Sequence, residues 1–193
     1  MNDLLSGWAE EIAVRELAVS LPQRWAHSQG VARQASRLAP ALGRAADLLA
    51  AAAVLHDVGY APRLAATGFH PLDGARFLRD SHGADEHLTR LVANHSFALL
   101  EAEERGLRGD LEREFPVPED RVLVDALVYC DMTTTPTGEL TTPAARLAEI
   151  LGRYGDDSIV GRFIRLAEPE IHAAAARTEA LLAAVVKGLA QPR

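Results

Sequence analysis

The chain has 193 residues, of which 48% are hydrophobic and 5% aromatic, and its formal net charge at pH 7 is −7. This length is sufficient for one domain with a real core, and the predominance of alanine and leucine among the apolar residues is typical of packed helices. Because the charge is negative and no basic run occurs, we do not expect duplex nucleic acid as a partner.

No apolar stretch suggests a membrane span, which needs about 18 to 20 residues. The first residues, MNDLLSGWAEE, lack the basic segment and apolar run of a signal peptide. We therefore expect a cytoplasmic protein with no membrane partner, and the sequence leaves the oligomeric state open. The single cysteine, Cys130, excludes an intrachain disulfide, and we interpret it as a buried structural thiol rather than a soft metal ligand.

Helical periodicity, interrupted by proline and glycine, divides the chain into helices joined by short loops. We expect helices near 3–20, 22–40, 44–57, 71–82, 85–100, 119–132, 143–154 and 157–188, the fifth extending to residue 105 at most. Residues 60–69 form a predicted loop, and residues 106–118 a mobile crossing. No strand alternation or internal repeat occurs. The sequence therefore predicts an all-α, single-domain helical bundle over residues 1–193.

Four polar residues stand where the apolar faces of three predicted helices should continue: His27, His56, Asp57 and Asp131. Burying an unpaired carboxylate is very costly unless it is hydrogen-bonded, protonated or bound to a metal. The two aspartates therefore need a shared partner. Two neutral imidazoles beside them suggest that this partner is a divalent cation.

The His56-Asp57 pair lies in the stretch AAAVLHDVGY, at the last turn of an alanine-rich helix, with Gly59 as the expected C-cap. With RWAHSQGVA before it and ALVYCDMTTTPTG after it, this stretch resembles the three signature segments of the HD superfamily of metal-dependent phosphohydrolases. The resemblance covers about residues 23–146. It implies an HD-type helical bundle, on which helices over 143–190 would pack.

Taken alone, the remaining histidines have ordinary interpretations. His95 faces inward and would be a satisfied core histidine, His70 would be a solvated loop residue, and His82 would favour the dipole of a helix C-terminus. His87 and His172 lie among acidic residues on expected surface.

The resemblance changes the interpretation of His70 and His95, because HPLDGA and LVANHS are similar to segments that hold a second metal in HD proteins. It implies one metal held by His27, His56, Asp57 and Asp131, and a second held by His70, His95 and a bridging Asp57. Imidazole with carboxylate suits Fe, Mn, Co, Ni or Zn better than Mg or Ca. We expect one or two divalent transition-metal ions, with iron or manganese preferred.

The implied activity is hydrolysis of a small nucleotide or related phosphoester through a metal-activated water, with Asp57 in the catalytic centre. Arg24, one turn before His27, resembles an arginine in HD-type dinucleoside tetraphosphate hydrolases, and we expect it to bind phosphate.

Arg63 and Arg146 are further candidates for binding substrate, although each arginine also has a simple interpretation as a surface residue. Asp73 is a candidate for proton transfer, and Thr134 for a hydrogen bond to substrate. Tyr60 stands where many HD proteins have a lysine, so phosphate binding must come from elsewhere.

Two other functions remain open from the sequence. One is a catalytically silent module that binds nucleotide or metal. The other is a mixed-valent di-iron oxygenase, since some HD proteins use the same six ligands to activate oxygen. The expected partner in the preferred interpretation is a small phosphorylated molecule.

Overall fold

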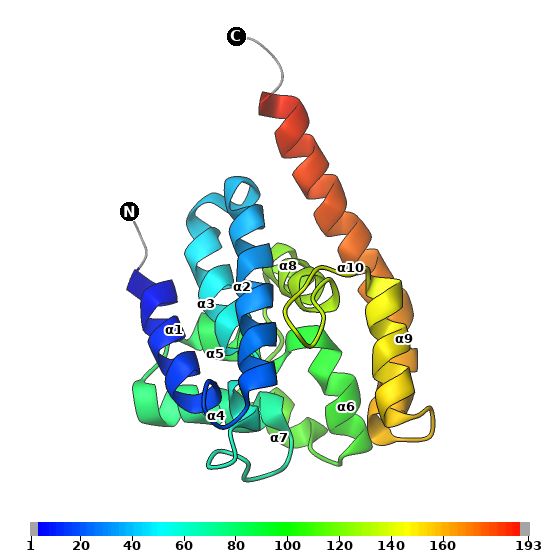
Figure 1. The fold of residues 1–193 in the computed structure, drawn as a ribbon. Coiled ribbons are helices and arrows are strands. Elements are labelled where there is room, and N and C mark those ends of the chain that lie inside the picture. Colours follow the sequence, from blue (N-terminus) through cyan, green and yellow to red (C-terminus); the bar gives the residue numbers. More distant parts are fainter. Residues whose placement is uncertain (1–3, 190–193) are drawn as a thin grey trace.

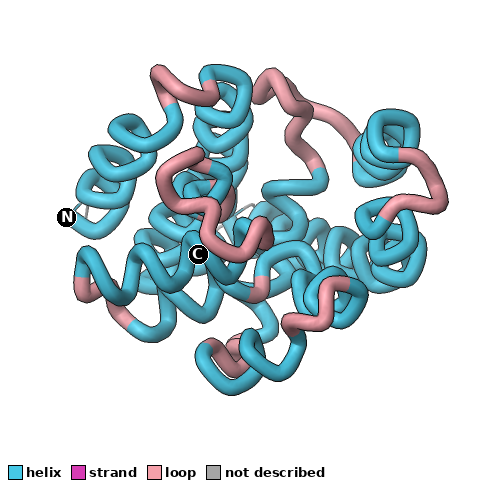
Figure 2. Tube along the Cα trace, turned by 90° about the horizontal axis from the view of Figure 1, so that it is seen from below, coloured by secondary structure: helices cyan, strands magenta, loops and turns pink. Residues whose placement is uncertain are grey.

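The structure, a computed structural model, describes residues 4–189. No strand occurs among these residues, and the only β-type contact within them is an isolated bridge between Thr134 and Leu140 (Figure 2). The predicted all-α bundle is confirmed. The helices are α1 Leu4–Leu17, α2 Pro22–Leu42, α3 Ala46–Leu55, α4 His70–His82, α5 Glu86–Ala93, α6 Ala98–Glu104, α7 Arg108–Glu114, α8 Arg121–Met132, α9 Pro143–Tyr154 and α10 Ile159–Leu189; short 3₁₀ helices are η1 Gly43–Ala45, η2 Val58–Tyr60 and η3 His95–Phe97.

Helix α8 is the central element of the bundle. It packs against α2 and α3 on one side and against α10 on the other, while α1 covers α3 and α9 covers α10 (Figure 1). The C-terminal part of α10 extends past the other helices. One hydrophobic cluster joins α1 through α8, and a second joins α8, α9 and α10. Both clusters meet at α8, which carries Asp131 near its C-terminal end.

Several helix boundaries follow from local chemistry. Pro22 opens α2 and Pro143 opens α9, positions where the missing N–H costs no hydrogen bond. Asp120 caps α8 by accepting hydrogen bonds from two backbone N–H groups. Gly83 ends α4 in the left-handed conformation, with φ of 58°. These boundaries agree with the predicted ones.

One segment, Pro22–Tyr60, is long and apolar enough by length and composition to cross a membrane, which corrects the expectation that no such stretch exists. It does not form one straight helix. Gly43, with φ of 55°, ends α2, and α3 then packs back against α2. The segment is thus a hairpin of the two helices α2 and α3.

The predicted helix over 85–100 is broken in the structure. Helix α5 ends at Ala93, η3 follows, and α6 begins at Ala98. Ser96 and Phe97 adopt positive φ values of 47° and 63°, which no other non-glycine residue in the described range does. Such conformations cost free energy and persist only where surrounding contacts hold them. No glycine or proline marks this break, so helical periodicity could not show it.

The predicted mobile crossing at 106–118 contains a helix, α7. Its apolar residue Leu111 is fully buried, and Phe115 directly after the helix is also buried. Arg76 and Arg79 of α4 form ion pairs with Glu114. The charges that suggested a solvated loop are therefore partners of neighbouring helices, and this prediction was wrong.

The predicted cap at Gly59 is also corrected. Helix α3 ends at Leu55, and Gly59 lies inside η2 without a positive φ. A Cβ atom at Gly59 would lie 2.0 Å from the carbonyl oxygen of His70. Glycine is therefore needed here because η2 and the start of α4 approach closely, which brings His70 beside the His56-Asp57 pair.

Candidate metal centre

His27 is oriented by the loop that follows α8. Its Nδ1 lies 2.9 Å from the carbonyl oxygen of Thr135. A carbonyl can only accept, so Nδ1 carries the proton and Nε2 is the nitrogen left to bind a metal. Nε2 lies 3.1 Å from an oxygen of Asp131.

Glycines allow this loop to lie close to α2. A Cβ on Gly138 would stand 2.2 Å from the carbonyl oxygen of Ala26, and one on Gly30 would stand 2.5 Å from Thr134. Arg33 donates a hydrogen bond of 2.8 Å to the Gly138 carbonyl. The close contact places Thr135 where it can fix the ring of His27.

His56 and His95 are oriented in the same way. Their Nδ1 atoms donate to the carbonyl oxygens of Ala53 at 2.8 Å and Val92 at 2.7 Å. Nε2 of His56 is buried and has no hydrogen-bond partner among the described residues. Burial lowers the pKa of His56 to about 4, so the ring is neutral at pH 7. A buried lone pair without a donor is what a metal ligand requires.

Asp57 lies between these histidines. Its Oδ1 is 3.3 Å from His70 Nε2 and 3.6 Å from His56 Nε2, and its Oδ2 accepts a hydrogen bond of 2.7 Å from Arg24. Burial alone would raise the pKa of Asp57, but His56, Arg24 and His70 hold it well below its usual range. The buried carboxylate is therefore ionised.

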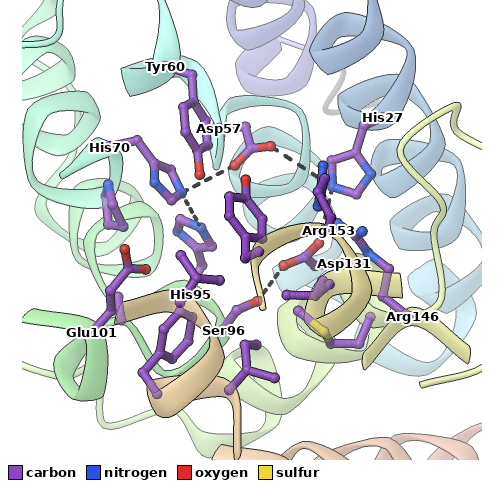
Figure 3. A pocket seen from close by; sticks show the side chains of 18 of the residues that line it. His27, Asp57, Tyr60, His70, His95, Ser96, Glu101, Asp131, Arg146 and Arg153 are labelled. Carbon is purple, nitrogen blue, oxygen red and sulfur yellow. Dashed lines mark hydrogen bonds and ion pairs between the residues drawn. The ribbon is translucent and has the colours of Figure 1, made fainter. Parts of the chain in front are cut away.

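Two sets of ligand atoms gather around Asp57. His27, His56 and Asp57 form one set and Asp57, His70 and His95 form the other, each with its ligand atoms within 4.8 Å of one another. The residues come from α2, from the turn after α3, from α4 and from η3, and His27, Asp57, His70 and His95 face a common space (Figure 3). Asp57 belongs to both sets, which is the arrangement of a carboxylate that bridges two cations.

The two histidines of the second set face each other through their Nε2 atoms, 3.2 Å apart. His95 already donates through Nδ1, so its Nε2 is the nitrogen that faces His70. Burial lowers the pKa of His70 to about 3, so this ring is also neutral at pH 7. A divalent cation that accepted the Nε2 lone pairs of both rings and an oxygen of Asp57 would satisfy all three groups, so the donor set fits a transition metal.

Asp131 adjoins the first set through His27. One of its oxygens faces His27 Nε2, and the other accepts a hydrogen bond from the hydroxyl of Ser96. Burial would raise the pKa of Asp131, but its contact with His27 and the nearby guanidinium of Arg146 hold the pKa below its usual range. The positive φ of Ser96 aims its hydroxyl at this carboxylate, which explains the break between α5 and α6.

All of these residues except His56 line a pocket of about 560 Å³, including space open to solvent. Its charged lining residues are three carboxylates, from Asp57, Glu101 and Asp131, and three guanidinium groups, from Arg24, Arg146 and Arg153 (Figure 3). The formal charges cancel. Any bound divalent cation would therefore leave the pocket positive, which favours an anionic ligand.

Two of the predicted phosphate-binding arginines lie at this pocket. Arg24 stacks over the ring of Tyr60 at 3.9 Å and pairs with Asp57. Arg146 is only 5% exposed and pairs with Glu149, while its Nε has no partner among the described residues. Both positions suit contact with an anion in the pocket.

Three predicted residues lie elsewhere, and their assigned roles do not fit their contacts. The side chain of Arg63 is 60% exposed and pairs with Glu16, outside the pocket lining. Asp73 accepts hydrogen bonds from the backbone of Thr67 and Gly68 and caps that loop. The hydroxyl of Thr134 donates to the carbonyl oxygen of Cys130 and packs on Gly30. Each is a structural contact.

The structure also adds lining residues that the sequence did not indicate, namely Ser96, Glu101, Arg153 and Tyr154. Ser96 follows His95 directly, a proximity that could have marked it. Glu101 and Arg153 stand in strongly charged stretches where nothing distinguishes them from surface residues. Cys130 is buried with a raised pKa, as a structural thiol should be.

A family model described as the HD domain matches residues 24–131, more than half of the chain. The matched range begins at Arg24, ends at Asp131 and contains every residue of the two ligand sets. No curated protein and no solved structure gives a significant match.

Proposed function

Because this chain belongs to the HD domain family, a superfamily of metal-dependent phosphohydrolases, we propose that it hydrolyses a small nucleotide or related phosphoester. The observation that carries the proposal is the sharing of buried Asp57 by two sets of histidine ligand atoms. An ionised, bridging carboxylate with lone-pair donors on both sides matches the ligand requirements of a dinuclear centre.

The proposed ligands are His27, His56, Asp57 and Asp131 for one ion, and Asp57, His70 and His95 for the other. Divalent ions held there would activate a water and neutralise the charge that develops on the phosphoryl group. The backbone carbonyls that fix three of the rings prepare the site, since each ring is oriented before any ion binds.

Three arginines are proposed to hold the phosphoryl group. Arg24 uses one N–H on Asp57, which leaves others for phosphate oxygens. Arg146 and Arg153 both pair with Glu149 on α9 and line the pocket. A planar guanidinium binds phosphate through two parallel hydrogen bonds, and Tyr60 supports Arg24 by stacking where other HD proteins have a lysine.

The overall charge supports a small substrate rather than a polymer. A net charge of −7 repels polyanions at a distance, whereas the metal-loaded pocket attracts a single phosphorylated molecule locally. We propose accordingly that the partner is a small phosphoester and that the protein acts in the cytoplasm.

The test is turnover by protein purified without chelator. The assay covers nucleoside monophosphates, cyclic nucleotides, dinucleoside polyphosphates and a bis-aryl phosphate, each with Mn, Fe, Co or Ni. We expect product release that depends on metal and is lost in His56→Ala. His172→Ala, the same change at an exposed histidine, is the control and should keep full activity.

If the folded, metal-loaded protein turned over none of these substrates, the proposal would be contradicted. Metal content with nucleotide binding but no turnover would then favour a silent binding module. Oxygen-dependent turnover with a mixed-valent EPR signal would favour an oxygenase.

A further inference from the structure

One wall of the pocket is apolar. It is formed by residues of α8, α9 and α10 from the second hydrophobic cluster: Met132, Ile150, Val160, Phe163 and Ile164. All except Val160 are buried. This wall borders the same cavity as the metal ligands, so a phosphoester bound at the metals would meet it.

Uncharged hydrogen-bonding side chains are scarce in the pocket. Among the described lining residues they are Ser96, Tyr60 and Tyr154. The Ser96 hydroxyl donates a hydrogen bond to Asp131, and the Tyr60 ring stacks with both Arg24 and His70. No asparagine, glutamine or threonine is present in this lining.

Recognition of a nucleobase or a ribose requires polar groups placed to pair with its edges and hydroxyls. A pocket that lacks such groups discriminates between ligands by the apolar surface area that each ligand buries. In the proposed function the two aspartates bind the cations and the three arginines bind the phosphoryl oxygens, while the remaining charged lining residue, Glu101, pairs with Arg105. Few side chains in the pocket are therefore left to form hydrogen bonds with a polar organic group of the substrate.

We infer that the organic group of the substrate is apolar, an alkyl or aryl group that packs on the wall from α8, α9 and α10. This inference rests on the proposed function and narrows its substrate class to phosphoesters of apolar alcohols or phenols. Nucleotides would then be turned over without selection for the base.

A series of phenyl phosphates tests the inference, supplied both as monoesters and as methyl diesters. The para substituents are hydrogen, ethyl, propyl and hydroxymethyl, which change the leaving group's acidity little. Ethyl and hydroxymethyl have nearly the same shape. We expect kcat/KM to rise by about fourfold for each added methylene, and to favour ethyl over hydroxymethyl on the order of 10- to 100-fold.

Val160→Thr places a hydroxyl on the wall with almost no change in volume. Because Val160 is only partly buried, this variant should fold. The ethyl-to-hydroxymethyl ratio of kcat/KM should fall by about fivefold or more. Val186→Thr, the same change on the same helix at a residue 66% exposed and outside the pocket, is the matched control and should keep the ratio.

Turnover of the whole series with equal kcat/KM, or preference for hydroxymethyl, would overturn the inference and leave the proposed function standing. A Val160→Thr ratio equal to that of the wild type would also overturn it. A silent phenyl phosphate series beside turnover of nucleotides would overturn the inference alone, whereas silence of both this series and the nucleotide panel means that the proposed function fails. In that case the affinity of the protein for the matching aryl phosphonates is measured by calorimetry. The inference requires this affinity to rise with the size of the apolar substituent.

Discussion

Three imidazoles of the candidate centre, those of His27, His56 and His95, have the same local design. Each donates its Nδ1 proton to a backbone carbonyl, and each presents Nε2 to the space around Asp57 or Asp131. The backbone thus selects the tautomer as well as the direction of the ring. A core histidine satisfied on both nitrogens would not leave Nε2 of His56 without a partner.

Replacement of Ser96 by alanine should lower the affinity for the metal ion that His27, His56, Asp57 and Asp131 are proposed to bind. Alanine keeps the Cβ atom, so backbone strain is little changed, but Asp131 loses the hydroxyl that orients it. Loss of such a supporting hydrogen bond lowers metal affinity by about 10- to 100-fold. Titration of the metal-free variant with Mn²⁺ measures this. Ser36→Ala, at an exposed serine, is the control, and equal affinity in both variants would contradict the role of Ser96.

Arg24→Ala should impair phosphate binding more than metal binding. The guanidinium pairs with Asp57 but is not a ligand, so metal content should stay near that of the wild type. Loss of charge-assisted hydrogen bonds worth about 1.5 to 3 kcal/mol lowers kcat/KM by about 10- to 150-fold. Steady-state kinetics and metal analysis on the same sample separate the two effects. Arg37→Ala is the exposed control, and an unchanged kcat/KM in Arg24→Ala would remove this residue from the site.

At the residue scale, the sequence identified the candidate metal ligands but not all of the residues that surround them. Polar residues ending apolar faces indicated His27, His56, Asp57 and Asp131, because burial makes such residues costly without a partner. Their roles as ligands stay a prediction until metal is measured. Glu101 could not be found, because its pocket position depends on the broken helix before it. The loop contacts of Asp73 could not be foreseen either, since a carboxylate that caps a loop has the same sequence pattern as one near a metal.

Among the elements, η2 and the start of α4 decide whether the second ligand set forms. They approach so closely that Gly59 and Gly74 lie against each other's backbone. His70 is the first residue of α4, so its position depends on this contact.

Gly59→Ala should therefore displace His70. A new Cβ atom 2.0 Å from the His70 carbonyl cannot be accommodated without moving backbone. We expect a loss of stability on the order of 1 to 3 kcal/mol, together with a fall in bound metal from about two ions to about one per chain. Gly7→Ala, at a helical glycine with nothing within 4 Å, is the matched control and should be neutral or stabilising. Two ions retained in Gly59→Ala would contradict this account.

Helix prediction succeeded where local chemistry sets the boundary. Proline at the start of α2 and α9, and glycine at the end of α4, act within one turn and are visible in sequence. The break at Ser96 and Phe97 depends on contacts with α8, which lies far along the chain, and left no local signal. The third helix was extended too far because Gly59 looked like a cap, whereas its role is a tertiary contact.

On the scale of the whole molecule, the centre joins helices from both hydrophobic clusters. Helices α2, α3 and α8 supply the first ligand set and its neighbour Asp131, while α9 and α10 close the pocket with an apolar wall. The all-α architecture was predictable from composition and periodicity. The division of the chain into a single domain over residues 1–193 stays a prediction.

The metal-free protein should lose stability in mild acid. His56 and His70 have pKa values lowered by burial to about 4 and about 3 from 6.5, so above pH 6.5 they are neutral whether folded or unfolded. As the pH falls below 6.5, the unfolded chain binds protons that the folded chain does not. Each histidine then lowers the free energy of unfolding by up to about 1.4 kcal/mol per pH unit. Denaturant titration from about pH 7.5 to about pH 4.5 measures this, and a constant free energy of unfolding over that range would contradict it.

The most direct test of the central claim is the amount of metal bound per chain in the wild type and in Asp57→Asn. Both proteins are loaded with Mn²⁺, freed of unbound metal and analysed by mass spectrometry. Because Asp57 belongs to both ligand sets, we predict about two ions per chain in the wild type and a loss of both in the folded variant. A folded wild type that binds no metal, or an Asp57→Asn variant that keeps both ions, would contradict the account.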